Sequence, residues 1–304
     1  MQTNEWPLVL FTLLCQTAVG VFLVSELLTA AAVRRMEMAE VLPLSAFLRL
    51  SILLITLAAA GISFFHLGRP LNAFRTLGNL STSWLSREIL FLLIFAACTV
   101  LLLGMASLAP QALAVARLFQ VTGGLAGLLL IFTMSRIYML PAVPTWNSMF
   151  TPRLFFSSTL LLGTAVTAAL WAVRLHAVNP ELSSGITAIW YRKTSPLLAG
   201  LTAGFLLISI LLTVLFALRM QKFQSLLQAS ERLFPSPGIV LLFRILLLLT
   251  AVVLAAVLFL HVRSETDSLS PLLAPWLILL GLIITAEVLG RHLFYNVFTR
   301  TGGL

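Results

Sequence analysis

The sequence predicts an all-α polytopic membrane protein with eight transmembrane helices in a bundle. Apolar residues make up 60% of the 304-residue chain and charged residues only 10%, whereas an ordinary soluble domain is about a quarter charged. This composition excludes an ordinary soluble enzyme. It also excludes a disordered chain, which would combine low hydrophobicity with high net charge. Because a helix needs about 20 apolar residues to cross the bilayer, eight spans and short loops fill the chain as one membrane domain, residues 1–304.

Long stretches with few charges mark the spans in order along the chain. We expect them at about residues 8–33, 44–65, 88–108, 113–139, 154–173, 196–218, 239–260 and 272–294. The longest loops between them are predicted at 68–87, 174–195 and 219–238, and the last contains an amphipathic piece at 221–233. An even number of spans places both ends of the chain on the same side of the membrane.

The first span predicts the orientation of the chain. Residues 1–7 lack the basic residues of a signal peptide, so we interpret this span as a retained anchor. Glu5 precedes it, and Arg34 and Arg35 follow it. The positive-inside rule then places the N-terminus, and with it the C-terminus, on the periplasmic side of a bacterial inner membrane. Over the whole chain, ten basic residues fall on the N-terminal face and eight on the other, Arg49 included, so the count does not strengthen this assignment.

Ionisable residues inside the spans gather toward the face where the chain begins. Such a residue costs about 2.5–3.5 kcal/mol at a helix centre and marks a site by default. Glu88 opens the third span, Arg244 lies near the start of the seventh, and Glu287 and Arg291 lie in the second half of the eighth. Glu287, Arg291 and Tyr295 are spaced four apart, so they share one helical stripe.

Polar and aromatic residues of the neighbouring loops lie on the same face. An alternative is that the aromatic residues form an interfacial belt and the arginines snorkel to the membrane surface. A belt explains the carboxylates Glu88 and Glu287 poorly, because a carboxylate gains nothing from it. We therefore predict a functional pocket on this face. Its candidate binding residues are His66, Gly68, Arg75, Asn79, Glu88, Arg136, Tyr138, Trp146, Glu287, Arg291 and Tyr295.

The predicted pocket contains the groups that the oxidation of a quinol requires. The apolar tail of a quinol enters from the bilayer, and each ring hydroxyl loses a proton to a nearby base as the electrons leave. His66, which titrates near neutral pH as histidines do, and the carboxylate Glu88 are the candidate catalytic proton acceptors. Arg136, Tyr138 and Arg291 are candidate hydrogen-bond donors.

The sequence contains no ligand set for a metal cofactor. Cys15 and Cys98 lie inside apolar spans and match neither a zinc site nor an iron–sulfur site. Axial haem ligands lie inside a bundle on facing helices, whereas all four histidines, His66, His176, His261 and His292, lie at or beyond span ends. We therefore expect no haem and no metal in this chain, and electron transfer to a partner protein. The net charge of +9 is attributed to loop arginines rather than to a nucleic-acid surface.

Five motifs on this face together resemble one family. They are His-Leu-Gly-x-Pro at 66–70, Ser-Trp-Leu-Ser-Arg-Glu-Ile at 83–89, Arg-x-Tyr at 136–138, Val-Pro-Thr-Trp at 143–146 and Glu-x-x-Gly-Arg-x-x-Phe-Tyr at 287–295. Over about residues 6–298 the chain resembles the membrane anchor subunits of bacterial dimethyl sulfoxide reductases. Arg69 departs from the pattern, because a small residue is expected there.

The resemblance implies a haem-free anchor of eight helices in the bacterial inner membrane. Such an anchor oxidises menaquinol near the residues that match His66 and Glu88. It passes the electrons to a four-cluster iron–sulfur subunit and on to a molybdopterin catalytic subunit in anaerobic respiration. The lipid bilayer is then the third partner of the chain.

Two other functions remain open from the sequence. One is an anchor of a related molybdenum reductase with another electron acceptor, because such anchors share the architecture. The other is a transporter, which would show broken helices near the membrane midplane and repeated halves. Gly123 and Gly124 in the fourth span are the only candidate break, and glycines are also common in membrane helices because they allow close packing.

Overall fold

A computed structural model describes residues 6–32, 34, 38–65, 77–177, 186–226, 237–264 and 273–296. These residues contain no strand, and a short 3-10 helix at Leu77–Asn79 accompanies eight long α-helices. Each of the eight contains a stretch long and apolar enough to cross a membrane, which confirms the predicted fold class. The helices are α1 (Trp6–Ala32), α2 (Met38–Ser63), α4 (Trp84–Leu108), α5 (Leu113–Tyr138), α6 (Phe150–Ala177), α7 (Ile186–Leu226), α8 (Pro237–Ser264) and α9 (Leu273–Asn296).

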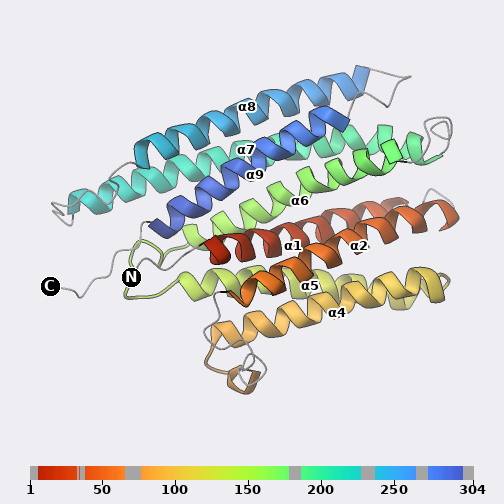
Figure 1. The fold of residues 1–304 in the computed structure, drawn as a ribbon, viewed down its shortest axis with the longest axis horizontal. Helices are drawn as coiled ribbons and strands as arrows, with labels where there is room; N and C mark the ends of the chain where they lie inside the picture. Colours follow the sequence, from red (N-terminus) through yellow and green to blue (C-terminus); the bar gives the residue numbers. More distant parts are fainter. Residues whose placement is uncertain are drawn as a thin grey trace.

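The helices form a bundle with α1 and α6 at its centre (Figure 1). In these two helices 67% and 78% of the membrane-spanning stretch is buried inside the protein, against 22–33% in the other six. The helices α2, α4 and α5 lie on one side of the central pair, and α7, α8 and α9 lie on the other (Figure 1). Both α1 and α9 have their terminal ends at the left of Figure 1, and we call this the N-terminal end of the bundle.

Two glycines allow the central helices to touch backbone to backbone. A Cβ atom added at Gly20 of α1 would lie 2.8 Å from the Cα atom of Gly163 in α6 and would overlap the carbonyl oxygen of Thr159. Only a hydrogen atom fits at this crossing. Helix pairs in membranes commonly associate through such small residues, because close approach increases van der Waals packing.

The outer helices present large apolar side chains on their outward surfaces. Leu54, Leu118, Val253 and Ile278 are among many that stay exposed in the isolated chain. In water so large an apolar surface would be unusual, whereas the acyl chains of a bilayer cover it. The exposure pattern therefore agrees with helices whose outer faces meet lipid.

Two prolines lie inside helices although the predicted spans begin beside or at them. The helix α2 begins five residues before Pro43, and α7 begins ten residues before Pro196. In membrane helices the backbone group that a proline leaves unbonded is commonly satisfied by neighbouring helices and hydroxyl side chains. The helix α7 also extends to Leu226, so it includes the first part of the amphipathic piece 221–233, and residues 227–233 lie outside the described part of the chain.

The fourth span contains no break at its glycines. The helix α5 runs without interruption from Leu113 to Tyr138. A Cβ atom at Gly123 would lie 2.8 Å from the Cζ atom of Phe22 in α1, so this glycine serves helix packing. The broken helix that a transporter would require is therefore not found at the position where the sequence suggested it.

Candidate functional site

Buried polar side chains gather near each end of the bundle. The group at the N-terminal end, which we call the N-terminal cluster, lies within about 10–14 Å of that end for Arg244 and Glu287, at 1.5 Å of helix rise per residue. The other group is formed by Glu26, Arg49 and Gln120. The members of the N-terminal cluster are Gln16, Glu88, Tyr138, Ser158, Ser209, Arg244, Glu287, Arg291 and Tyr295.

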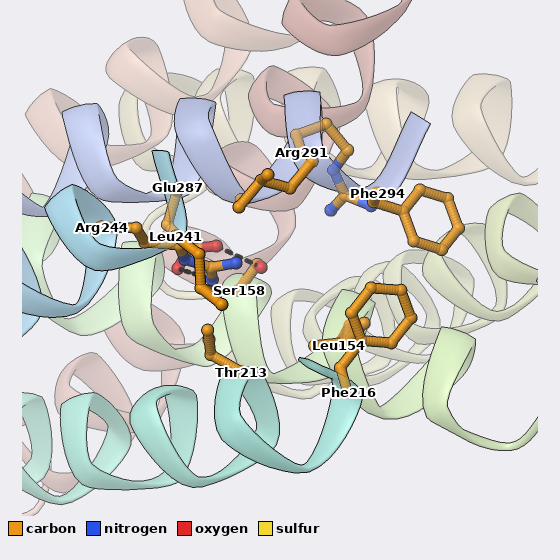
Figure 2. Close-up of a pocket in the computed structure, with 11 residues that line it drawn as sticks. Leu154, Ser158, Thr213, Phe216, Leu241, Arg244, Glu287, Arg291 and Phe294 are labelled. Atoms are coloured by element: carbon orange, nitrogen blue, oxygen red, sulfur yellow. Dashed lines mark hydrogen bonds and ion pairs between the residues drawn. The ribbon is translucent and has the colours of Figure 1, made fainter. Parts of the chain in front are cut away.

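Glu287 of α9 is held by donors from three other helices. The Ser158 hydroxyl of α6 donates to its Oε2 atom, and the Ser209 hydroxyl of α7 donates to its Oε1 atom at 3.3 Å. The Arg244 guanidinium of α8 also donates to Oε1, at 3.3 Å (Figure 2). Glu287 is only 2% exposed, and a buried carboxylate persists when it is both paired and hydrogen-bonded. This contact joins four helices.

Gly290 makes the approach of Arg244 possible. A Cβ atom at this position of α9 would lie 2.6 Å from the Nη2 atom of Arg244 and would overlap the rest of the guanidinium. The guanidinium therefore lies directly against the backbone of α9. This is the physical reason for a glycine in the motif Glu-x-x-Gly-Arg at 287–291.

Arg291 connects α9 with α1 and α6. Its Nη2 atom donates to the Oε1 atom of Gln16 at 2.8 Å, and its guanidinium carbon lies 3.9 Å from the centre of the Phe155 ring. It also interacts electrostatically with Glu287 and Tyr295. A guanidinium placed over an aromatic ring in a desolvated site is stabilised by the cation–π attraction.

Two tyrosine hydroxyls form the part of the cluster nearest the end of the bundle. The Tyr295 hydroxyl donates to the Tyr138 hydroxyl at 2.9 Å, which links the last turns of α9 and α5. Trp146 supports the pair, because its Nε1 atom donates to the Phe294 carbonyl at 2.8 Å and its ring stacks on the Phe294 ring at 5.5 Å between centroids. The aromatic rings around both tyrosines fix the positions of the hydroxyl groups.

Glu88 lies in the second turn of α4 and is 4% exposed. Its carboxylate interacts electrostatically with Tyr138 and Tyr295. No side chain in the described part of the chain forms an ion pair or a hydrogen bond with it. Glu88 and Glu287 therefore differ: Glu287 is saturated with donors, whereas Glu88 is a buried carboxylate in apolar and aromatic surroundings.

The structure brings six of the predicted site residues together and leaves two apart. Glu88, Tyr138, Trp146, Glu287, Arg291 and Tyr295 all lie in or beside the N-terminal cluster. Arg136 lies over the Trp84 ring at 5.1 Å, with Arg87 at 4.2 Å from the same ring. Asn79 is an exposed residue of the 3-10 helix.

The remaining predicted residues, His66, Gly68 and Arg75, lie outside the described part of the chain. Residues 66–76 carry the first of the five sequence motifs, so the structure neither supports nor opposes their place in the pocket.

Sequence reasoning did not assign Gln16, Ser158, Ser209 and Arg244 to the site. Arg244 was recognisable as an ionisable residue inside a span, and Gln16 is the one amide side chain within predicted span 8–33. The serines offered little signal, because hydroxyl groups in membrane helices usually bond to their own backbone. Thr159 and Thr202 do so in this bundle.

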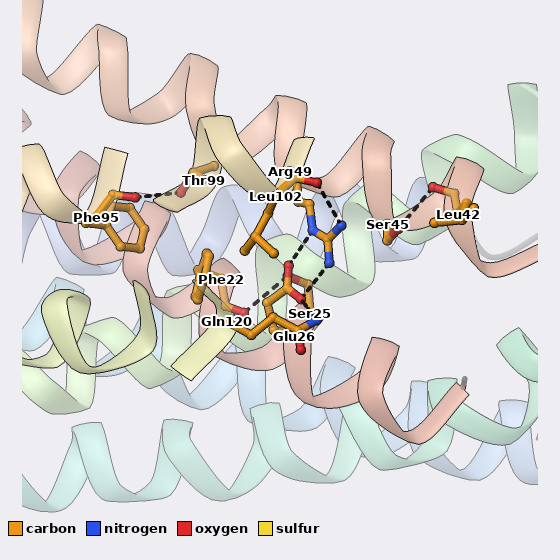
Figure 3. A network of polar contacts seen from close by, with 10 residues as sticks. All are labelled: Phe22, Ser25, Glu26, Leu42, Ser45, Arg49, Phe95, Thr99, Leu102 and Gln120. Atoms are coloured by element: carbon orange, nitrogen blue, oxygen red, sulfur yellow. Dashed lines mark hydrogen bonds and ion pairs between the residues drawn. The ribbon is translucent and has the colours of Figure 1, made fainter. Parts of the chain in front are cut away.

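The cluster at the opposite end is a closed ion pair (Figure 3). The Nε and Nη2 atoms of Arg49 donate to the two carboxylate oxygens of Glu26 at 2.7 and 2.9 Å, and Gln120 donates to the same carboxylate at 2.7 Å. The Nη1 atom of Arg49 donates to the Leu102 carbonyl at 3.2 Å. Arg49 is therefore not a loop charge and does not belong in the count of basic residues that orient the chain.

Comparisons with known proteins agree with the geometry. The family model described as the DMSO reductase anchor subunit (DmsC) matches residues 1–297. The anaerobic dimethyl sulfoxide reductase chain YnfH of Escherichia coli (strain K12) is 30% identical over 303 residues, which are 98% of this chain and 96% of the relative. The C subunit of the anaerobic dimethyl sulfoxide reductase of the same organism is 26% identical over 304 residues, with the same coverage. The corresponding C subunit from Haemophilus influenzae is 28% identical over 170 residues, which are 55% of this chain and 58% of the relative. The chain therefore belongs to the DMSO reductase anchor subunit (DmsC) family.

Proposed function

We propose that this chain anchors a dimethyl sulfoxide reductase-type complex in the bacterial inner membrane and oxidises menaquinol at the N-terminal end of its bundle. The electrons pass to a four-cluster iron–sulfur subunit and then to a molybdopterin catalytic subunit, in anaerobic respiration. Family membership supports the anchor role. The observation that carries the quinol site is Glu88, a buried carboxylate without an ion-pair partner in the described residues, close to a hydroxyl pair.

The side chains of this chain handle protons in the proposed reaction. Oxidation of one quinol to the quinone releases two electrons and two protons. The electrons go to oxidised clusters of the partner subunit, and the carboxylate of Glu88 accepts a proton from a ring hydroxyl as general base. The hydroxyls of Tyr138 and Tyr295 are hydrogen-bond partners for the ring oxygens. His66 is proposed as the second proton acceptor on the basis of the family resemblance.

Glu287 is less suited than Glu88 to accept a proton. Its two oxygens already accept hydrogen bonds from Ser158, Ser209 and Arg244. We assign Glu287 and Arg291 to the electrostatic surroundings of the tyrosine pair, because Arg291 interacts with both Glu287 and Tyr295.

The N-terminal end of the bundle is proposed to face the periplasm. Arg34 follows α1 at the opposite end, and the positive-inside rule assigns that end to the cytoplasm. The iron–sulfur subunit then docks on the periplasmic side, near the quinol.

Glu88→Gln in the assembled complex tests this proposal. The substitution keeps the shape of the side chain and removes the base, so quinol-dependent turnover is expected to fall by about 10²–10⁴-fold. Turnover with an artificial reductant that supplies the catalytic subunit directly is expected to stay unchanged. Asn79→Ala, at an exposed predicted residue, is the control that retains quinol turnover. Normal quinol turnover in assembled Glu88→Gln complexes would refute the assignment.

A further inference from the structure

A small cavity lies beside the ion pair of Arg244 and Glu287 (Figure 2). It has a volume of about 40 Å³ and is bounded by α6, α7, α8 and α9. Ser158, Arg244, Glu287 and Arg291 form its polar wall, and apolar side chains, including Phe216, close the other side. One water needs about 10–15 Å³ of such space, whereas small-molecule pockets measure roughly 300–1,000 Å³. The cavity therefore accommodates a monatomic ion or a few waters and excludes a quinone ring.

The wall of the cavity carries more positive than negative charge. Arg244 and Arg291 are 7% and 5% exposed, and a guanidinium stays protonated in proteins. Among the residues that the structure describes, Glu287 is the only carboxylate that pairs or interacts with either arginine. The site thus holds an excess of one positive charge at membrane depth. An uncompensated buried charge is strongly destabilising, so a counter-charge is required.

The hydrogen bonds of the wall point to the same kind of ligand. The Nε atom of Arg244 is buried without a hydrogen-bond partner, and so is the Nε2 atom of Gln16, whose Oε1 atom binds Arg291. The oxygens of Glu287, by contrast, already accept three hydrogen bonds. Donors are therefore in surplus and acceptors are used up. Water could accept these hydrogen bonds but would leave the charge uncompensated.

We propose that this cavity binds a small monovalent anion of halide size, held between Arg244 and Arg291. The bare backbone at Gly290 allows the Arg244 guanidinium to reach the site. The bound anion neutralises the excess charge and accepts the hydrogen bonds that the protein leaves unmade. This inference does not depend on the proposed oxidation of menaquinol.

Thermal unfolding of the intact purified complex in detergent tests the proposal. Chloride is replaced by gluconate, which is too large for the cavity, and then titrated back as chloride or bromide at constant ionic strength. A ligand that binds only the folded state raises the unfolding temperature with its concentration. We expect a saturable rise with both halides, and anomalous scattering from bromide in the cavity of crystals grown in bromide.

Two variants shift the halide dependence in opposite directions. Arg244→Gln makes the net charge of the site zero, so the halide dependence is expected to disappear. Glu287→Gln raises the net charge to two, so half-saturation is expected at a several-fold lower halide concentration. Arg153→Gln, at an exposed arginine of the same end, is the control that keeps the wild-type dependence.

Three results would overturn the proposal. Equal unfolding temperatures in chloride and gluconate would show that no halide binds. Equal halide dependence in the wild type and Arg244→Gln would indicate an adventitious ion only. Density in the cavity without a bromide signal would identify water. If Arg244→Gln fails to assemble, Glu287→Gln decides, because tighter halide binding cannot result from misfolding.

Discussion

Removing Arg49 tests the energetic role of the ion pair at the end opposite the N-terminal cluster. In Arg49→Met, the Glu26 carboxylate loses two hydrogen bonds of 2.7 and 2.9 Å and keeps only the bond from Gln120 at 2.7 Å. The Leu102 carbonyl loses its donor as well. Because the substitution leaves a buried charge without its partner, we expect a loss of about 3–5 kcal/mol in the free energy of unfolding.

The double variant separates the buried charge from the loss of contacts. Adding Glu26→Gln removes the uncompensated carboxylate and keeps an amide that can still bond Gln120. Replacing a buried ion pair as a whole is often close to neutral, so the double variant should lie within about 1 kcal/mol of the wild type. Arg117→Met, at an exposed arginine of the same end, should change the stability by less than about 0.5 kcal/mol.

The assay is equilibrium unfolding of the full chain in mixed micelles with a denaturing detergent. A cost for Arg49→Met below about 1 kcal/mol, the range of surface ion pairs, would refute the reasoning. A double variant that is less stable than Arg49→Met would refute it too, because removal of the unpaired charge would then bring no gain.

Two further predictions concern glycines that other groups approach closely. Gly20→Ala forces α1 away from the backbone of α6 and is expected to cost about 1–3 kcal/mol as an overpacking substitution; thermal unfolding should show no such loss for Gly104→Ala, where a Cβ atom meets open space. Gly290→Ala displaces the guanidinium of Arg244 and should weaken the halide dependence of stability, measured by the same chloride titration. Gly281→Ala, on the same helix with no atom near its added Cβ, should keep that dependence, and equal behaviour of the two variants would contradict the proposed position of the guanidinium.

The number of helices and the gathering of charges could be predicted from the sequence because both follow from the cost of polarity in lipid. A long apolar stretch has few alternatives to a spanning helix. A carboxylate inside such a stretch, such as Glu88 or Glu287, needs polar neighbours, so its position indicates a site.

The partners of individual side chains could not be predicted, because they depend on how helices are rotated and offset against one another. Arg49 and Glu26 are 23 residues apart on different helices, and no spacing within either helix indicates their pairing. Arg136 belongs to a motif of the predicted pocket, yet its guanidinium lies over Trp84, since its rotamer is set by packing. Helix starts were misplaced at Pro43 and Pro196 because neighbouring helices compensate for the lost hydrogen bond.

The central claim is that Glu88 takes a proton when quinol is oxidised in this chain. The most direct measurement mixes the oxidised, fully assembled complex with menaquinol and follows the first reduction of the partner's iron–sulfur clusters. In Glu88→Gln this single-turnover rate is expected to fall by about 10²–10⁴-fold, while dithionite still reduces the clusters completely. An unchanged rate of cluster reduction by menaquinol in Glu88→Gln would contradict the account.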